Sequence, residues 1–395
     1  MHRSATMIFA GLALTLLGGA GTPQSERWGG AWGYATSPAT KAVRGTLPAG
    51  TYRFRFRLSQ SGDAIRLVFT NPEGAVPLRI ASASIARAAK DFGIAPETER
   101  PVRFESGEGV SITGGATLTS APVDLGVKSG EDVVVTVVTS AESSTVAGNA
   151  AFPAAFFAGP ADAAGTGMAA QKIRPLVTQI AVRNPSANCT IVTFGDSITE
   201  GARGTRPDWR GWPGILAKRL SDGGKPHCGV VNMGISGNRL LREGRGTAGI
   251  DRFERDVASV AGVTHLILLE GINDIWKAGS EGEQPVTAAD LIAGYRKLIE
   301  AGHARGIKVI GGTLTPGWGS KYITPEMEGL RQEVNRWIRT GGAFDGVIDF
   351  EAAVRDTSSP VMIKPVFDSG DKLHPGDSGY EAMGRAVPLA LFPSR

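Results

Sequence analysis

A serine, a histidine and an aspartate in the C-terminal half of the chain could together break an ester bond. Ser197 follows an apolar run that ends at Phe194, where the pattern changes from strand to helix. A serine hydroxyl is a weak nucleophile unless a neighbouring base takes its proton. A helix N-terminus would direct backbone N–H groups at the negative charge that develops during acyl transfer. A serine at this position is also what an ordinary helix cap contains, so the chemistry depends on a base that can reach it.

The five histidines offer one good candidate for that base. His227 and His265 stand at the start of predicted strands, which is the wrong end of a parallel sheet for chemistry. Two others fall in an N-terminal apolar leader and in the last turn of an amphipathic helix. His374 remains, and Asp371, three residues before it, is near enough to orient the imidazole ring. By position alone, Asp371 could equally cap the loop that carries it.

Two loops after predicted strands offer hydrogen-bond donors for the oxyanion of such a reaction. Gly237, in the run after Met233, could present an unobstructed backbone N–H. Asn273, in the run after Leu269, could donate from its side-chain amide. With the backbone N–H of Ser197, these groups make three donors for one tetrahedral intermediate. Asn is a common turn residue, so a structural role for Asn273 stays open.

The elements that must position these residues alternate between strands and helices. From Cys189 onward the strand-like runs are 190–194, 229–233, 264–269, 308–310 and 347–350, and the helical segments are 212–220, 287–306, 324–340 and 380–391. This alternation predicts a parallel sheet with helices on both faces, in which ligands bind beyond the carboxyl ends of the strands. Most of the candidate residues follow strand ends, as that rule requires.

The N-terminal half has a different period. In the segment TYRFRFRLS, residues 51–59, apolar side chains alternate with Arg53, Arg55 and Arg57, which predicts a strand with its arginines in water. Many short strands with Gly-rich turns predict a β-sandwich, or jelly-roll-like, domain. We expect the Ala/Gly-rich stretch 147–170 to be a long surface loop or linker. The predicted organisation is therefore an N-terminal β-rich domain with its linker over 27–183 and an α/β domain over 187–395.

The first 22 residues have the layout of a secretory signal peptide. A basic start precedes an apolar run of 11 residues from Met7 to Leu17, and small residues follow. A retained anchor is the alternative, although the run is short for a membrane span. We expect a secreted or periplasmic protein with no membrane contact after the signal is cleaved.

Composition limits the other classes. The net charge is +4 over 395 residues and no block of like charge occurs, so we expect no nucleic-acid partner. Two cysteines and five histidines cannot supply a multi-cysteine zinc site, and we expect neither a metal nor a cofactor.

Four short blocks occur in the order used by the SGNH (GDSL-type) hydrolase superfamily, which the chain resembles from about residue 190 to residue 391. The blocks are Gly195-Asp196-Ser197, Ser236-Gly237-Asn238, Gly271-Ile272-Asn273-Asp274 and Asp371-Lys372-Leu373-His374. The resemblance implies a flavodoxin-like three-layer α/β/α fold and a serine esterase. Ser197 would be its nucleophile, His374 its general base and then acid, and Asp371 the partner of His374. The oxyanion hole would consist of the backbone N–H groups of Ser197 and Gly237 and the Asn273 side chain.

The sequence segments around these blocks, such as GVVNMGISGNRLL and FDSGDKLHPGDSGYEAM, are similar to those of a bacterial two-domain subfamily of acetylxylan esterases and arylesterases. This similarity implies an enzyme that removes acetyl or other short acyl groups from polysaccharide through an acyl-enzyme intermediate. One alternative is a lipolytic or aryl esterase that acts on lipid or small-molecule esters. Another is a carbohydrate-binding protein with an inactive hydrolase domain, which the complete set of candidate residues disfavours.

Two further expectations concern Trp276 and the cysteines. Trp276, three residues after Asn273, is the best candidate to line the substrate pocket, with packing between helix and sheet as the alternative. In the flavodoxin-like order the first two strands are neighbours. Cys189 and Cys228, which lie at equivalent places in those strands, could therefore form a disulfide in an exported protein. Two free buried thiols are the alternative.

Overall fold

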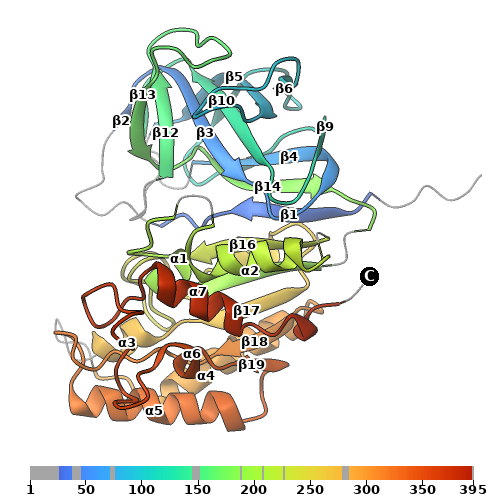
Figure 1. Cartoon of the computed structure of the whole chain (residues 1–395). Coiled ribbons are helices and arrows are strands. Elements are labelled where there is room, and N and C mark those ends of the chain that lie inside the picture. Colours follow the sequence, from blue (N-terminus) through green and yellow to red (C-terminus); the bar gives the residue numbers. More distant parts are fainter. Residues whose placement is uncertain are drawn as a thin grey trace, which may run out of the picture.

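The computed structural model shows two stacked parts, one made mainly of strands and one of strands and helices (Figure 1). It describes residues 26–37, 46–71, 76–144, 152–186, 189–206, 209–225, 227–277 and 284–393. The predicted signal peptide, residues 1–22, lies outside the described residues. Among the helices of the described ranges, none is both long and apolar enough to span a bilayer.

Five parallel strands form the centre of the C-terminal half, in the order β16-β15-β17-β18-β19. Their bounds are β15 Cys189–Gly195, β16 Cys228–Gly234, β17 His265–Leu269, β18 Lys308–Gly312 and β19 Gly346–Ile348. The first of these strands along the chain, β15, occupies the second position in the sheet, and the next, β16, forms the edge beside it. Strands β17, β18 and β19 follow in order on the other side of β15. This is the flavodoxin-like 2-1-3-4-5 order. Strands β15 and β17 are buried along their whole length. The α/β architecture predicted for this half is confirmed.

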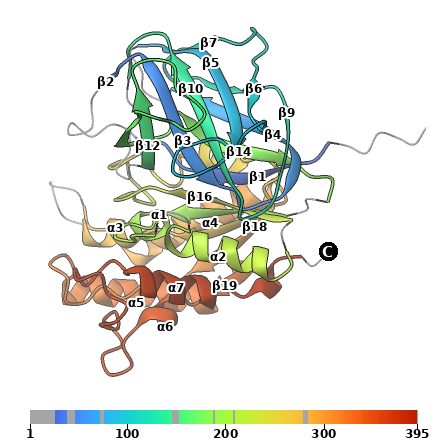
Figure 2. The same ribbon diagram turned by 45° about the horizontal axis from the view of Figure 1, so that its top comes forward.

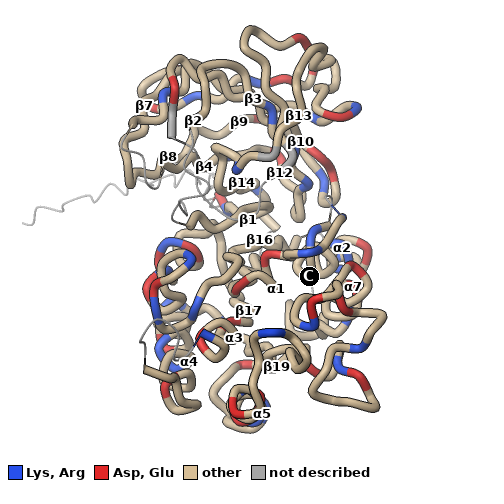
Figure 3. The backbone as a smooth tube through the Cα atoms, turned by 90° about the vertical axis from the view of Figure 1, so that its left-hand side faces the viewer, with Lys and Arg blue, Asp and Glu red and all other residues tan. Residues whose placement is uncertain are grey.

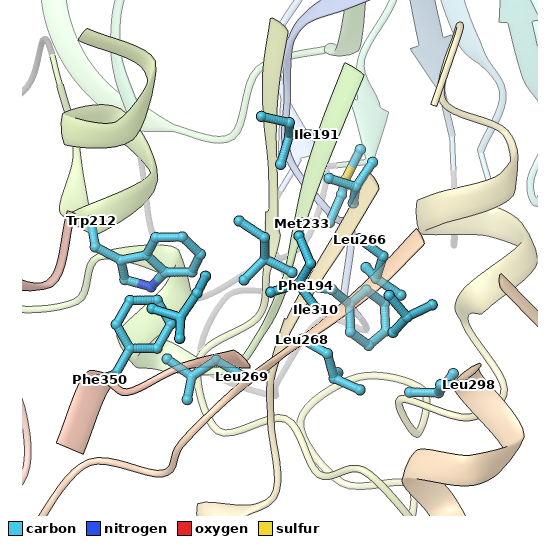
Figure 4. Close-up of a cluster of buried hydrophobic side chains, with 14 of the residues drawn as sticks. Ile191, Phe194, Trp212, Met233, Leu266, Leu268, Leu269, Leu298, Ile310 and Phe350 are labelled. Atoms are coloured by element: carbon cyan, nitrogen blue, oxygen red, sulfur yellow. The ribbon is translucent and has the colours of Figure 1, made fainter. Parts of the chain in front are cut away.

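Helices cover both faces of this sheet. Their bounds are α1 Ser197–Glu200, α2 Gly211–Asp222, α3 Ile272–Trp276, α4 Ala288–His303, α5 Pro325–Thr340, α6 Phe350–Val354 and α7 Asp377–Ala386, with a π-helical turn at Glu254–Ala258 and a 3-10 turn at Leu389–Leu391. Figure 4 places Trp212 of α2 and Phe350 of α6 on one side of the strands and Leu298 of α4 on the other. The rings of Trp212 and Phe350 lie 4.9 Å apart, so Trp212 belongs to the core between helices and sheet.

The sequence signals for two helix starts match the structure. Thr287 accepts a hydrogen bond from the Asp290 N–H, and the Asp290 carboxylate accepts one from the Thr287 N–H, which forms a capping box at the start of α4. Thr324 caps α5, which has Pro325 at its first position.

The N-terminal half consists mainly of two antiparallel sheets. One has the order β1-β14-β4-β8 with β9 beside β4, and the other has the order β13-β12-β3-β10-β5-β6 with β7 beside β5. The bounds are β1 Trp28–Gly33, β2 Thr46–Leu47, β3 Gly50–Arg57, β4 Gly62–Thr70, β5 Leu78–Arg87, β6 Arg100–Val102, β7 Val110–Ile112, β8 Thr117–Thr119, β9 Val123–Val127, β10 Asp132–Thr139, β11 Ser143–Ser144, β12 Phe152–Phe157, β13 Ala169–Ile173 and β14 Val177–Arg183. Side chains from both sheets share one hydrophobic cluster, which includes Phe54 of β3 and Leu67 of β4. This half is rich in sheet, as predicted, and its assignment as a jelly-roll-like domain stays a prediction.

The stretch 147–170 is not only a loop, in contrast to the prediction. Residues 152–157 form β12, which pairs with β3 and with β13, and Ala154 and Ala155 are buried. Alanine side chains are small enough to fit between packed strands. An Ala-rich composition is therefore compatible both with a buried strand and with a linker, and it does not distinguish the two. Residues 145–151 lie outside the described part.

Arg53 also differs from its prediction, because it is buried rather than in water. Its guanidinium donates to the carbonyl oxygens of Phe92 at 3.2 Å and Asp162 at 2.6 Å. These acceptors make its burial tolerable. Arg55 and Arg57 of the same strand both pair with Asp132 at 2.7 Å.

The two halves meet where β1 lies against β16 at the edge of the parallel sheet (Figures 1 and 2). Glycines allow this approach, because a Cβ atom at Gly30 would lie 2.7 Å from the Val231 side chain. The Ser59 hydroxyl accepts a hydrogen bond from the N–H of Val230 at 2.8 Å. It therefore satisfies one backbone group on the side of β16 where the parallel sheet has no further strand. The N-terminal half therefore covers the β16 edge of the parallel sheet.

Cys189 and Cys228 stand opposite each other at the beginning of β15 and β16. Their Cα atoms lie 4.5 Å apart, and a disulfide joins them. The cysteines are 39 residues apart, and in the chain-entropy model closing such a loop stabilises the fold by about 4 kcal/mol.

Basic and acidic residues are interspersed along the chain in both halves (Figure 3). Several of them pair at the surface, as Arg183 does with Glu26 and Asp63. This mixed pattern matches the small net charge of the sequence.

Candidate active site

Ser197 begins α1 directly beyond the end of β15. Asp196 caps this short helix, because its carboxylate accepts a hydrogen bond from the Ile198 N–H at 2.9 Å. Just before it, a Cβ atom at Gly195 would lie 2.1 Å from the Leu269 carbonyl oxygen, so glycine lets the chain turn close to β17. The Ser197 hydroxyl therefore lies at the carboxyl ends of the parallel strands, where ligands bind in folds of this type.

A chain of hydrogen bonds connects Ser197 to His374 and Asp371. The Ser197 Oγ atom lies 2.8 Å from His374 Nε2, and His374 Nδ1 lies 2.8 Å from Asp371 Oδ2. Partial burial works to raise the pKa of Asp371, but hydrogen bonds from His374 outweigh it and hold that pKa below its usual value. An ionised Asp371 keeps the proton of His374 on Nδ1, so that Nε2 presents its lone pair to the serine hydroxyl.

The loop of Asp371 is shaped to make this contact. Its second carboxylate oxygen, Oδ1, accepts the backbone N–H groups of Leu373 at 3.0 Å and His374 at 2.8 Å. The loop-capping role and the histidine-orienting role, which sequence reasoning treated as alternatives for Asp371, are both present in one side chain.

Two backbone N–H groups near Ser197 are available to a ligand. Gly237 has φ +77° and occupies the third position of a turn closed by the Asn238 N–H and the Ile235 carbonyl at 3.0 Å, a conformation that favours glycine. Across the described part of the chain, the N–H groups of Ser197 and Gly237 donate to no other atom. Both can therefore donate to an oxyanion without losing an existing bond.

The Asn273 side chain is held in one orientation by two neighbours. Its Oδ1 accepts the indole N–H of Trp276 at 2.7 Å, and its Nδ2 donates to the Asn238 carbonyl at 2.9 Å. An amide nitrogen carries two N–H bonds, so one remains for a ligand. Trp276, predicted as a pocket residue, thus orients Asn273, and its ring contacts Tyr322 with centroids 4.6 Å apart.

We expect Asn273→Ala to lower kcat by about 10²-fold, because it removes one of the three predicted oxyanion donors. KM should change little, since the donor acts mainly on the tetrahedral state. Steady-state kinetics with p-nitrophenyl acetate measures both constants. Asn184→Ala, which removes the same side chain from the N-terminal half, is the control and should leave kcat unchanged. A kcat for Asn273→Ala within threefold of the parent would exclude the side chain from the oxyanion site.

Arg252, which sequence reasoning missed, ties strand ends together beneath the site. This fully buried side chain donates to the carbonyl oxygens of Gly195 at 3.0 Å and Met233 at 2.8 Å, at the ends of β15 and β16. It also donates to Asn238 Oδ1 at 2.8 Å, next to the proposed Gly237 donor. The sequence around it, DRFERD, has the composition of a solvated helix and gives no signal for this role.

Buried carboxyl groups lie around Arg252. Burial raises the pKa of Asp196 to about 7 and that of Asp274 to about 6. Asp274 accepts the N–H groups of Leu240 at 2.6 Å and Leu241 at 2.9 Å, so it holds the loop that follows Gly237. Asp196 and Asp274 therefore hold loops in place. Within the residues that the structure describes, no cluster of three or more His, Cys, Asp and Glu side chains is suited to a metal ion.

The four sequence blocks therefore lie together beyond the carboxyl ends of the parallel strands. Residues 193–382 match the model of the GDSL-like lipase/acylhydrolase family. The C-terminal half of the chain belongs to the SGNH (GDSL-type) hydrolase superfamily. The protein is accordingly a carboxylic ester hydrolase.

Solved structures that resemble this SGNH hydrolase cover about half of its chain. They include an acetylxylan esterase from Geobacillus stearothermophilus, with 21% identity over 53% of this chain and 98% of that one and a TM-score of 0.40. A GDSL-like lipase from Bacteroides thetaiotaomicron has 18% identity over 52% of this chain and 88% of that one, with a TM-score of 0.38. The LAE5 hydrolase from the Lake Arreo metagenome has 19% identity over 52% of this chain and 95% of that one, with a TM-score of 0.40. No curated protein matches the chain.

Proposed function

We propose that the protein is an exported serine esterase that removes acetyl or other short acyl groups from polysaccharide. The observation that carries the proposal is the unbroken path from Ser197 Oγ through the His374 ring to Asp371, with 2.8 Å at each step. Both ends of the imidazole ring have the partners that nucleophilic catalysis requires.

Acylation follows from this geometry. His374 Nε2 takes the hydroxyl proton as Ser197 Oγ bonds to the ester carbonyl carbon, and the carbonyl oxygen becomes an oxyanion. The N–H groups of Ser197 and Gly237 and the Asn273 amide donate to that oxyanion. The protonated ring, stabilised by ionised Asp371, then gives its proton to the leaving alcohol oxygen.

Deacylation repeats these steps with water. His374 takes a proton from a water molecule that attacks the acyl carbon of the Ser197 ester. The second tetrahedral state collapses as Ser197 Oγ leaves with the proton from the ring. The products are a carboxylic acid, which loses its proton to water, and the free enzyme, and the proposed cycle consumes no cofactor.

An apolar wall beside the site supports the substrate class. Ile272, Ile323 and Leu373 form a small buried cluster against which the rings of Trp318 and Tyr322 pack. Leu373 directly precedes His374, so this wall adjoins the reacting bond. Broad aromatic faces such as these suit the apolar face of a sugar or a short acyl group. The proposed sandwich-like N-terminal half and the similarity of the sequence blocks to acetylxylan esterases also support an acylated polysaccharide as the substrate.

Export is supported by two features of the chain. The leader has the layout of a signal peptide, and Cys189 and Cys228 are joined by a disulfide, a bond that persists in oxidising compartments.

Release of acetate from acetylated xylan tests the substrate. We expect acetate to be released by the parent protein, and the rate on p-nitrophenyl esters to fall as the acyl chain lengthens. Ser197→Ala, assayed in parallel, should release none above background. Highest activity on long acyl chains, with no acetate released from the polysaccharide, would identify the protein as a lipolytic or aryl esterase instead.

A further inference from the structure

We infer that Arg174, from the N-terminal half, positions the oxyanion loop of the hydrolase half through Glu200. The inference rests on the proposed function, because it assumes that Gly237 donates to the oxyanion. It makes the N-terminal half a part of the catalytic apparatus and gives that half a task other than binding a polysaccharide.

The first link crosses between the two halves. Arg174 lies in the loop between β13 and β14, and its Nη2 atom is 2.8 Å from Glu200 Oε1 at the end of α1. Only 3% of the arginine side chain and 5% of the glutamate side chain are exposed. A pair so well shielded from water is held much more strongly in place than a surface ion pair, and each charge depends on the other.

The second link runs from Glu200 to the oxyanion loop. The other carboxylate oxygen, Oε2, accepts the backbone N–H of Ser236 at 3.1 Å, one residue before Gly237. Glu200 also lies three residues after Ser197 on the same short helix, so one carboxylate connects the helix of the nucleophile to the turn of the second donor.

The contact between α1 and β16 is tight enough to transmit such a constraint. A Cβ atom at Gly234 would lie 2.3 Å from the backbone nitrogen of Glu200, and Asn232 donates to the Thr199 carbonyl at 2.9 Å. The turn 235–238 can present its central peptide in two orientations, as in type I and type II turns. The Glu200 carboxylate accepts the Ser236 N–H and so fixes the peptide that directly precedes the central peptide of the turn.

Charge gives Arg174 a second effect on the same site. A carboxylate near the place where an oxyanion forms would oppose that charge if it stood alone. Arg174 neutralises Glu200 and leaves the donors of the loop to act on the oxyanion. Removal of Arg174 should therefore both loosen the turn and reduce the compensation of the Glu200 charge, to which Arg210 also contributes.

The test compares Arg174→Met with a matched control in the full-length chain. Arg55→Met is the control, because Arg55 borders the same cavity of about 650 Å³ between the halves as Arg174 but pairs with Asp132 of its own half. We expect Arg174→Met to lower kcat on p-nitrophenyl acetate about 10-fold or more, as small misplacements of catalytic groups do, with KM within twofold. The control should match the parent in both constants.

Two further variants keep the test sharp if Arg174→Met folds poorly. Glu200→Gln should lose kcat to a similar extent, because an amide cannot accept at both ends, and Arg174→Lys should recover part of the loss. The double variant Arg174→Met with Glu200→Gln should be no slower than the worse single variant, since both act through one link.

An inhibitor that forms an oxyanion adduct separates this role from general stability. Binding of a trifluoromethyl ketone should weaken in Arg174→Met by the same factor as kcat, while the melting temperature of the control and of Arg174→Lys stays that of the parent. Unchanged kcat and inhibitor binding in both Arg174→Met and Glu200→Gln would overturn the inference and leave the esterase proposal intact. Full activity in Ser197→Ala would instead overturn the proposed function itself.

Discussion

The Ser197→Ala variant should lose at least about 10³-fold in kcat, because it removes the hydroxyl that we propose forms the acyl-enzyme and leaves only the rate that comes from the oxyanion donors and binding. The serine Oγ lies 2.8 Å from His374 Nε2. Hydrolysis of p-nitrophenyl acetate, corrected for the spontaneous rate, measures the loss. A matching thermal unfolding curve shows that the fold is retained.

Ser221→Ala is the matched control for this variant. Ser221 lies in α2, away from the hydrogen-bonded chain, and its loss should leave kcat within error of the parent. If Ser197→Ala kept more than a tenth of the parent kcat, Ser197 would not be the nucleophile.

His374→Ala should also lower kcat by at least about 10³-fold, because every proton transfer of the proposed cycle passes through its ring. The decisive comparison is with the double variant Ser197→Ala, His374→Ala. Groups that act as one unit lose their effect together, so the double variant should be no slower than either single one. The control is His303→Ala, whose ring pairs with Asp345 at 2.8 Å on the surface of α4. Additive losses in the double variant would show that the two side chains act in separate steps.

The sequence predicts the layout of the site because its positions follow from local rules. Ser197, Gly237 and Asn273 each come directly after a buried apolar run, and the carboxyl ends of parallel strands meet at one edge. Adjacent strands β15, β16 and β17 therefore bring these residues together whatever the details of packing. Elimination among the histidines similarly leaves His374. The catalytic roles of these residues stay predictions until they are measured.

Other features depend on contacts between distant segments and leave no local pattern. Arg252 reaches Gly195, 57 residues away, and Arg174 reaches Glu200 across the boundary between the halves. Arg53 follows the alternation of a half-exposed strand, yet the loop around Asp162 covers it and supplies its acceptors. In each case burial is decided by what packs on top, which periodicity along one strand cannot indicate.

The stretch 147–170 illustrates the same limit. Its alanines and glycines favour a flexible loop by composition, but β12 within it completes a ladder with β3. Trp276 lies beside Asn273, but its hydrogen bond to that residue requires a side-chain orientation that spacing does not give. Its role in the substrate pocket stays a prediction.

Labelling with a fluorophosphonate tests the central claim most directly. This reagent phosphonylates a serine only when a base activates the hydroxyl and donors stabilise the tetrahedral product. Peptide mass spectrometry of the full-length chain should find one phosphonyl group, on Ser197, and His374→Ala should take up the label far more slowly. Rapid labelling of a different residue, or an active protein that resists the reagent, would contradict the account.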